Sequence, residues 1–374
     1  MQEGGILIID DNEVNRVICS INLEEMRVPL HFAENGKEGL ELALKILPDL
    51  ILLDIMMPVM DGFEMLGRLK RDETLSEIPV LMLSAKSETD SVVKALELGA
   101  NDYLKKPFEA EEMVARVKTL LRSRYLEKQI KEDLRTGAAM QQKFLTDAKA
   151  ATAQLEQSCL KTEIYNKPYA TISGDFYYTF PLSNAGTGIF LGDSCGHGLP
   201  AALISMRIIG FLQQLAKENP SPAQILGQLN NDLYGLLPPE KFVAGSCLAF
   251  SENSCTISNA AQPYPVLLSG KGLEEILLDG PPLGMRPNCS YQEHSVELRP
   301  GDRLILFTDG IVEATDWQED YYGKTRLLDC LTRQAGAQSL QGLKDALLED
   351  LHRFSKNAPI DDDQTIILFE RMRK

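Results

Sequence analysis

Apolar runs alternate with amphipathic stretches through the first third of the chain. Each of four runs ends at a polar residue: 6–9 before Asp10, 50–53 before Asp54, 80–83 before Ser84 and 103–104 before Lys105. Continuous apolar strands separated by helical segments are typical of a parallel sheet that is covered on both faces. Ligand chemistry in such sheets lies at the carboxyl ends of the strands. We therefore expect those ends to bring together Asp10, Asp11, Asp54, Ser84 and Lys106.

The middle of the chain has a helical pattern. Residues 108–167 contain no proline and a single glycine, Gly137, and most of them are strong helix formers. The pattern predicts one long helix that starts near residue 109 and extends as far as residue 150. Its apolar positions include Val114, Val117, Leu121, Leu126, Ile130 and Leu134. This seam is irregular, so a coiled coil and a helix packed on its own domain both remain open.

After residue 160 the chain changes to short strands, glycine turns and a few helices. Helical patterns cover 199–216, 222–237 and 339–354, and strand-like runs cover 188–191, 242–250, 303–307 and 365–369. This texture predicts an α+β domain built on a sheet core.

The overall charge narrows the classes of partner. The chain has 374 residues, with 38 Lys and Arg against 54 Asp and Glu, a net charge of −16. Binding to a phosphate backbone needs clustered positive charge, so we expect no nucleic-acid partner. The longest apolar stretch is too short to span a bilayer, and the start MQEGG does not resemble a signal peptide. The seven scattered cysteines are typical of reduced thiols. We expect a cytoplasmic protein without a membrane partner.

The first group of polar residues suits phosphoryl transfer. Three carboxylates beside one lysine form an anionic pocket for a hard divalent cation, and Mg²⁺ is the first choice. Asp54 could then accept a phosphoryl group as an acyl phosphate, a known role for a carboxylate nucleophile. A single Asp at a strand end is more often a turn former or a helix cap. Five such positions at strand ends, in one order along the chain, favour a phosphoryl-transfer site over isolated turns or caps.

These residues resemble the receiver domain of two-component response regulators over about residues 5–122, in the motifs IIDDN, LLDIMMPVMDG, LSA and DYLKKPF. The resemblance implies a doubly wound, flavodoxin-like α/β fold with five parallel strands, in which Asp54 is the phosphoacceptor. It implies a Mg²⁺ site in which Asp11, Asp54 and the carbonyl of Met56 are ligands and Asp10 assists through water. Ser84 and Tyr103 match the switch pair, although Tyr103 also fits an ordinary amphipathic strand. Lys106 precedes a proline for which the family pattern implies a cis bond.

A second group consists of aspartates next to glycines or in tight turns. They lie in SGD at Asp175, GDSCGHG at Asp193, TDG at Asp309 and DDDQT at Asp362. Carboxylates without a cysteine or histidine shell suit Mn²⁺ or Mg²⁺, and a pair of such ions can hold a hydroxide in line with phosphorus. Each Asp-Gly alone is more often an ordinary turn. The joint pattern carries the prediction.

Residues 139–370 are similar to the PPM-type (protein phosphatase 2C-like) Ser/Thr phosphatases, in the branch of sporulation-stage-II-E and sigma-regulator enzymes. The stretch PGDRLILFTDGIVEA and the ending DDDQT carry the resemblance. It implies a β-sandwich flanked by helices with two Mn²⁺ or Mg²⁺ ions. Asp193 would bridge the ions, the Ser194 carbonyl would contribute, and Asp175, Asp309 and Asp362 would complete the shell. His197 is either a proton donor or a plain turn histidine.

Together the two resemblances predict a response regulator with a phosphatase output. The expected domains are a receiver at 1–122, a helical linker at 123–158 and a phosphatase at 159–374. A histidine kinase or phosphotransfer protein would supply phosphate, and the substrate would be a phosphorylated regulatory protein, by analogy an anti-sigma-factor antagonist. A homodimer through the linker helix is expected. The family patterns GGDFYD and NAGH read SGDFYY and NAAQ here, which motivates an alternative: a phosphorylation-gated adaptor with a non-catalytic phosphatase fold.

Overall fold

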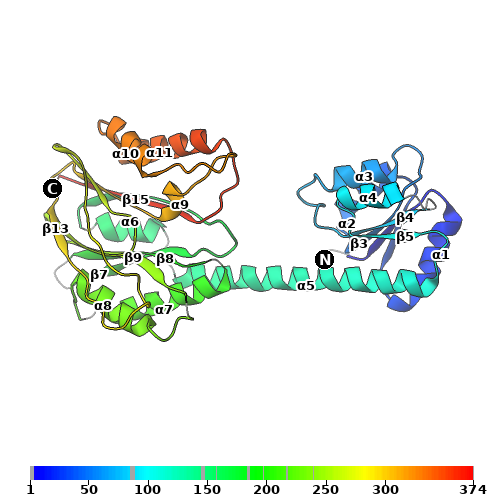
Figure 1. Ribbon diagram of the computed structural model, residues 1–374, viewed down its shortest axis with the longest axis horizontal. Helices are drawn as coiled ribbons and strands as arrows, with labels where there is room; N and C mark the ends of the chain where they lie inside the picture. Colours follow the sequence, from blue (N-terminus) through cyan, green and yellow to red (C-terminus); the bar gives the residue numbers. More distant parts are fainter. Residues whose placement is uncertain are drawn as a thin grey trace. The chain divides into compact units, whose positions relative to one another are not determined.

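The computed structural model describes residues 4–84, 89–144, 148–156, 158–182, 186–196, 198–215, 218–238 and 240–373. The chain forms two compact units, Met1–Glu132 and Asp133–Lys374 (Figure 1). None of the helices in the described ranges combines the length and apolar character that crossing a membrane requires.

The N-terminal unit is built on a parallel sheet. Its strands are β1 (Ile6–Ile9), β2 (Leu30–Ala33), β3 (Leu50–Asp54), β4 (Val80–Ser84) and β5 (Asp102–Lys105), in the order β2-β1-β3-β4-β5. All four pairings are parallel. This is the flavodoxin-like order, so the predicted doubly wound fold is confirmed.

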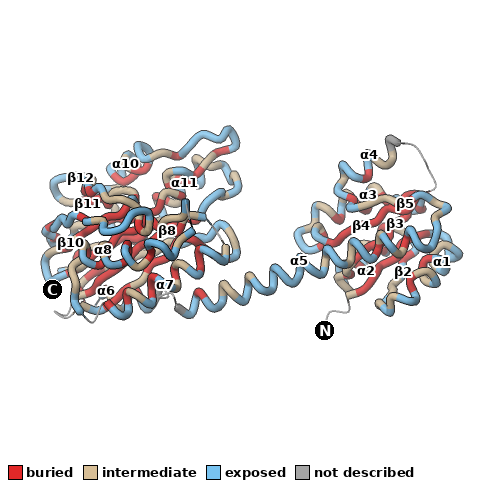
Figure 2. Tube along the Cα trace, turned by 60° about the horizontal axis from the view of Figure 1, so that its bottom comes forward, coloured by how far each residue is buried: buried red, intermediate tan, exposed pale blue. Residues whose placement is uncertain are grey.

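Helices cover both faces of this sheet. Alternate strand residues point to opposite faces, and Ile6 and Ile8 pack with α1 (Glu13–Leu23) and the start of α5 (Ala110–Phe144). Leu7 and Ile9 belong to the other core. That core includes residues of α2 (Gly36–Ile46), α3 (Gly62–Leu69) and α4 (Thr89–Glu97). A short 3₁₀ helix, Glu24–Met26, follows α1. In Figure 2 the buried residues of this unit are concentrated in the strands.

The predicted long helix is present. Helix α5 runs over Ala110–Phe144 with Gly137 inside it, and α6 (Ala148–Glu156) follows. The expected start near residue 109 is confirmed, whereas residues 145–147 of the predicted helix lie outside the described residues. Near the start of α5, Met113 and Val117 are buried against the N-terminal parallel sheet, while Leu126 and Ile130 farther along are exposed.

The C-terminal unit contains two antiparallel sheets. The first has the order β13-β10-β9-β8-β7 and consists of β7 (Asp175–Pro181), β8 (Thr187–Ser194), β9 (Val243–Phe250), β10 (Ser254–Ala260) and β13 (His294–Glu297). The second has the order β12-β11-β14-β15-β6 and consists of β6 (Leu160–Lys167), β11 (Val266–Ser269), β12 (Gly272–Glu275), β14 (Arg303–Phe307) and β15 (Gln364–Arg371).

Three apolar layers hold this unit together. Inner residues such as Leu191 of the first sheet and Ile367 of the second share one core with α6. The outer face of the first sheet packs on α7 (Leu199–Leu215) and α8 (Pro222–Leu233). The outer face of the second sheet packs on α10 (Lys324–Arg333) and α11 (Leu340–Ser355). The predicted β-sandwich flanked by helices is confirmed. A short helix, α9 (Asp309–Val312), follows β14.

Candidate phosphoryl-transfer and metal sites

The N-terminal candidate site lies at the carboxyl ends of the parallel strands. Lys106 Nζ forms ion pairs with Asp10 Oδ2 (2.5 Å) and with Asp54 Oδ1. Asp10 is fully buried and also accepts hydrogen bonds from Asn15 Nδ2 (2.9 Å) and from the amide N–H of Asn12 (2.9 Å). The carboxyl ends of three strands, β1, β3 and β5, therefore bring two carboxylates and one ammonium group together.

The ion pairs set the charge states of this site. Burial raises the pKa of Asp54, and the hydrogen bond from Lys106 opposes that shift. Burial alone would lower the pKa of Lys106, but its hydrogen bonds to Asp10 and Asp54 outweigh burial and raise it. The lysine therefore stays charged and helps to keep Asp54 ionised, as a nucleophilic carboxylate requires.

The other receiver candidates lie around this centre. Asp11 is exposed next to Asp10, and Ser84 is buried at the end of β4. Met56, two residues after the candidate phosphoacceptor, donates its backbone N–H to Asp54 Oδ2 (2.8 Å). Tyr103 is half-buried in β5. The peptide bond between Lys106 and Pro107 is cis, as predicted.

The C-terminal candidate site begins with a pair of opposed aspartates. The register of β7 and β8 places Asp175 directly opposite Asp193. Like charges that face each other across two strands destabilise a sheet. Gly174 approaches the end of β8 closely, since a Cβ at this position would lie 2.9 Å from the Ser194 carbonyl oxygen and 2.8 Å from that of Gly196. The glycine thus leaves room beside the carbonyl that we expect to bind an ion.

Residues of the second sheet connect to this pair at the same end. Thr308 follows β14 and Thr365 belongs to β15, and each donates its hydroxyl to Asp175 Oδ2 over 2.7 Å. Asp363 accepts the backbone N–H of Gly174 (2.5 Å) and that of Tyr169 (2.7 Å). These contacts tie the two sheets together beside the candidate site.

The connection between the two sheets also sets the positions of the remaining two aspartates, Asp309 and Asp362. Thr308 donates its backbone N–H to the Thr365 carbonyl (3.1 Å), which aligns the residue after β14 with the residues before β15. Asp309 and Asp362 therefore lie at the same end of the sandwich. We call Asp175, Asp193, Asp309 and Asp362 the acidic cluster.

The electrostatics of the acidic cluster show mutual repulsion. Burial raises the pKa of Asp193 to about 8, and the charges of Asp309 and Asp362 add to this effect. Burial and the nearby Asp193 charge raise the pKa of Asp175 well above its usual range. Burial also raises the pKa values of Asp309 and Asp362. Among the described residues, no lysine or arginine forms an ion pair with these four carboxylates.

The chemistry of these donors fits hard divalent cations. The acidic cluster and the Ser194 carbonyl supply only oxygen atoms, which Mg²⁺ and Mn²⁺ prefer. The buried hydroxyl of Ser194 has no hydrogen-bond partner within the described part of the chain. Across those same residues, no three acidic, histidine or cysteine side chains stand close enough together to form a ready-made metal site. Ion binding would thus draw the carboxylates together and relieve their repulsion.

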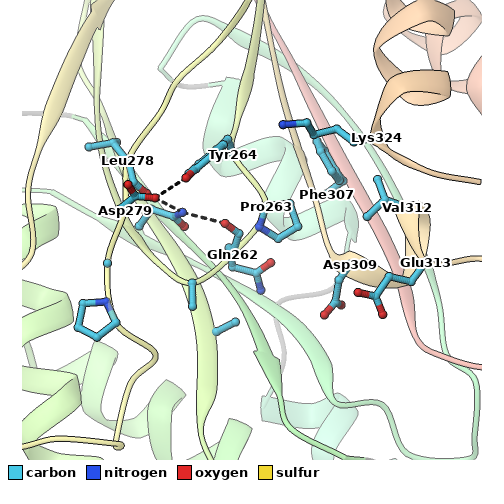
Figure 3. A pocket seen from close by; sticks show the side chains of 15 residues that line it. Gln262, Pro263, Tyr264, Leu278, Asp279, Phe307, Asp309, Val312, Glu313 and Lys324 are labelled. Atoms are coloured by element: carbon cyan, nitrogen blue, oxygen red, sulfur yellow. Dashed lines mark hydrogen bonds between the residues drawn. The ribbon is translucent and has the colours of Figure 1, made fainter. Parts of the chain in front are cut away.

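An open pocket of about 690 Å³ adjoins the acidic cluster. Asp309 lines it together with Glu313 of the segment after α9. Burial raises the pKa of Glu313, and the nearby charge of Asp309 adds to this effect. Figure 3 shows both side chains on one side of the pocket. His197, a candidate proton donor, lies outside the described residues.

Two family models match the chain. The response regulator receiver domain matches residues 6–118, and stage II sporulation protein E (SpoIIE) matches residues 183–372, about half of the chain. The chain belongs to the SpoIIE family. It is a response regulator in which a receiver domain precedes a PPM-type phosphatase domain.

The curated relatives match about a third of the chain, the length of the receiver part. The receiver is 48% identical over 117 residues to the DNA-binding dual master transcriptional regulator RpaA of a Synechocystis strain, covering 31% of this chain and 48% of RpaA. The chain thus spans about half the length of the curated relatives it matches.

Solved structures show the fold of the SpoIIE part. The SiaA PP2C domain of Pseudomonas aeruginosa aligns with a TM-score of 0.57 and 24% identity, over 66% of this chain and 98% of that domain. The RsbU and RsbW domains of Rv1364c from Mycobacterium tuberculosis align with a TM-score of 0.50 and 20% identity, over 57% of this chain and 60% of that one.

Three supporting residues of the SpoIIE domain were not singled out from the sequence. Thr308, Asp363 and Thr365 hold Asp175 and the loop before it through side-chain hydrogen bonds. The signal was present, because Thr308 belongs to the TDG motif and the other two belong to DDDQT. Their roles depend on contacts between residues that are more than 130 positions apart, which no local pattern predicts.

Proposed function

We propose that the SpoIIE domain hydrolyses phosphoserine and phosphothreonine on a regulatory protein, with two Mn²⁺ or Mg²⁺ ions held by the acidic cluster. The observation that carries this proposal is the opposition of Asp175 and Asp193, with Asp309 and Asp362 at the same end of the sandwich. Buried, mutually repelling carboxylates without a basic partner among the described residues are a natural site for cations.

The proposed roles follow from the contacts of each residue. Asp193 would bridge the ions, with the Ser194 carbonyl, Asp175, Asp309 and Asp362 as the other ligands. When bound, the ions would supply a hydroxide nucleophile at neutral pH and stabilise the charge of the reacting phosphate. The hydroxyls of Thr308 and Thr365 orient Asp175. Asp363 fixes the turn at Gly174 by accepting its backbone N–H.

We propose further that Asp54 of the receiver accepts phosphate from a histidine kinase or a phosphotransfer protein. One oxygen of Asp54 attacks the phosphorus, the bond from phosphorus to the donor nitrogen breaks, and an acyl phosphate forms. Mg²⁺ held by Asp10, Asp11, Asp54 and the Met56 carbonyl would neutralise charge during this transfer. Lys106 is already within hydrogen-bond distance of Asp54, and Ser84 and Tyr103 would respond to the new phosphate as the switch pair.

The proposed substrate is an anti-sigma-factor antagonist, by analogy with the sigma-regulator branch of the family. We also propose that residues 123–158 link the receiver (1–122) to the phosphatase (159–374) and pair two copies of the chain. Exposed Leu126 and Ile130 on α5 support pairing. Sedimentation equilibrium of the wild type and of a Leu126→Lys, Ile130→Lys double variant tests it, and identical masses would reject pairing through this helix.

One assay tests the proposed activity. Phosphate release from a phosphoserine peptide is measured with Mn²⁺, with and without beryllofluoride as a phosphate mimic on Asp54. We expect Mn²⁺-dependent turnover whose rate changes when the mimic binds. Peptide binding without any turnover would instead support the adaptor alternative.

A further inference from the structure

The pocket beside Asp309 has a second wall whose chemistry the metal site does not use. It is formed by the turn after β10, which carries Gln262, Pro263 and Tyr264. In Figure 3 the side-chain amide of Gln262 extends toward the side of the pocket that holds Asp309 and Glu313. We call this cavity the Gln262 pocket. Its lining also includes the apolar side chains of Pro281, Leu278, Phe307 and Val312.

The amide of Gln262 is buried without a partner. Only 5% of the residue is exposed, and Nε2 has no hydrogen-bond acceptor among the described residues. Buried amide groups are nearly always paired, so such an orphan calls for an explanation. Gln262 lines the open pocket although this nitrogen has almost no exposed surface, so a rotation of its side chain would be needed to bring Nε2 to an acceptor on a bound molecule.

The backbone around Gln262 is held in place. Asn259 Nδ2 donates to the Gln262 carbonyl (2.8 Å) and to the Leu278 carbonyl (3.0 Å), and Ser246 donates its hydroxyl to Asn259 Oδ1 (2.7 Å). Ala261 has a left-handed backbone with φ of 59°. A non-glycine residue in that conformation is strained and persists only where its surroundings impose it. The turn therefore fixes the backbone of Gln262 beside the pocket.

The position of the pocket indicates what binds there. Since Asp309 belongs to the acidic cluster and also lines the pocket, the main chain that flanks a phosphorylated side chain at the cluster would lie beside this pocket. The pocket offers that segment apolar walls and the neutral amide of Gln262, and its charged lining includes Asp309, Glu313 and a lysine, Lys324, that is paired with Glu275. A backbone carbonyl only accepts hydrogen bonds, so it matches the Gln262 amide.

We propose that the Gln262 pocket binds the polypeptide segment next to the phosphorylated residue of the substrate, and that Gln262 Nε2 donates a hydrogen bond to a backbone carbonyl of that segment. The inference rests on the proposed phosphatase function and adds its substrate class: a protein segment with apolar residues beside the phosphoserine. Gln262 is a positioning residue in this scheme, because it touches the flanking chain and not the reacting phosphorus.

The test compares two substrates with and without the donor. The probes are p-nitrophenyl phosphate, which has no flanking chain, and a phosphoserine decapeptide with leucine on both sides of the phosphoserine. In the full chain with Mn²⁺, Gln262→Leu should raise KM for the peptide about tenfold, the size expected for one neutral hydrogen bond. Its turnover of p-nitrophenyl phosphate should stay within about twofold of the wild type.

Two further variants separate positioning from a structural role. Gln262→His restores an N–H donor and should recover the peptide KM, whereas Gln341→Leu makes the same chemical change on the exposed face of α11 and should alter nothing. The melting temperature of Gln262→Leu should be no lower than that of the wild type, since the lost Nε2 has no partner among the described residues.

Each contrary outcome has a distinct meaning. An unchanged peptide KM in Gln262→Leu overturns the subsite. An equal loss with both probes also overturns it, because the amide would then act on the phosphate itself. If the wild type hydrolyses neither probe with Mn²⁺, the proposed function fails and the inference fails with it.

Discussion

The two candidate sites balance their negative charge in opposite ways. In the receiver, Lys106 lies between Asp10 and Asp54 and pairs with both. In the SpoIIE domain, the acidic cluster has two threonine hydroxyls and backbone N–H groups as partners, and no basic residue pairs with it in the described part of the chain. A site with its own lysine keeps a charged carboxylate ready as a nucleophile. A site without one is incomplete until cations bind.

The largest effect on turnover is expected when Asp193, at the centre of the acidic cluster, is replaced. Asp193→Asn should lower Mn²⁺-dependent turnover of p-nitrophenyl phosphate by more than about 100-fold, since losing even a residue that supports a metal ligand costs about 10–100-fold. The matched control is Asp345→Asn, the same change on the exposed face of α11, which should keep full activity. Equal turnover in the two variants would reject the bridging role of Asp193.

Asp54→Asn makes the corresponding change in the receiver. Asparagine keeps the shape of the side chain and loses the anionic nucleophile, so labelling by acetyl phosphate with Mg²⁺ should disappear. The metal-dependent turnover of the SpoIIE domain should persist, because its carboxylates are untouched. Phosphate incorporation, read by intact mass, measures the first effect. Labelling at the wild-type level would contradict the assignment of Asp54.

Lys106→Met should leave the carboxylates of the receiver without a basic partner, as in the acidic cluster of the SpoIIE domain. It leaves Asp10 and Asp54 buried without their cation, and removing one partner of a buried pair typically costs several kcal/mol. We expect the receiver to lose about 2 kcal/mol of unfolding free energy at neutral pH and to regain much of it with Mg²⁺. Lys105→Met, at the exposed neighbouring position, is the control. If Lys106→Met leaves the urea unfolding of the receiver unchanged, Lys106 does not balance the charge of Asp10 and Asp54 as the comparison states.

How far the sequence predicts these sites depends on the distance between the partners. Asp54 and Lys106 were predictable because strand ends in a parallel sheet converge on one edge. The four cluster aspartates were predictable through their motifs. The roles of Thr308 and Asp363 were not, since these residues act on a strand that begins at Asp175. Gln262 differs again: it stands out only because the fold buries its amide at a pocket.

A smaller effect concerns the metal-free protein. The pKa of Asp193 is raised to about 8 by burial and by its acidic neighbours. Between about pH 4 and pH 8 the unfolded chain therefore releases a proton that the folded chain keeps, and the free energy of unfolding falls as pH rises. Asp193→Asn should remove this loss. After chelation, its melting temperature at pH 8 should exceed that of the wild type by roughly 2–4 °C per kcal/mol of relieved repulsion.

Melting temperatures of the wild type and Asp193→Asn at pH 4 and at pH 8 provide the internal control for that prediction. At pH 4 the two proteins should melt together, because Asp193 is protonated in the folded wild type. Added Mn²⁺ at pH 8 should reverse the order, since only the wild type retains the bridging ligand. A difference that is the same at pH 4 and pH 8 would show that charge repulsion is not its cause.

The smallest effect tests the neutral partners of the cluster. Thr308→Val keeps the side-chain shape and removes one of the two hydroxyl donors to Asp175. The same hydroxyl also accepts the backbone N–H of Thr365 (3.1 Å), so the expected loss is about 1.5 kcal/mol of unfolding free energy, in the range of two hydrogen bonds. Thr332→Val on α10, whose hydroxyl bonds a carbonyl in its own helix, is the control. If both variants unfold alike in urea, the hydroxyl of Thr308 does not stabilise Asp175.

The most direct measurement is an Mn²⁺ titration of the chelator-treated full chain, followed by hydrolysis of p-nitrophenyl phosphate. The charge comparison predicts no turnover without the ion, recovery on titration in the wild type and in Asp54→Asn, and no recovery in Asp193→Asn. Turnover in the chelated wild type, or equal recovery in Asp193→Asn, would contradict the claim that cations complete the acidic cluster.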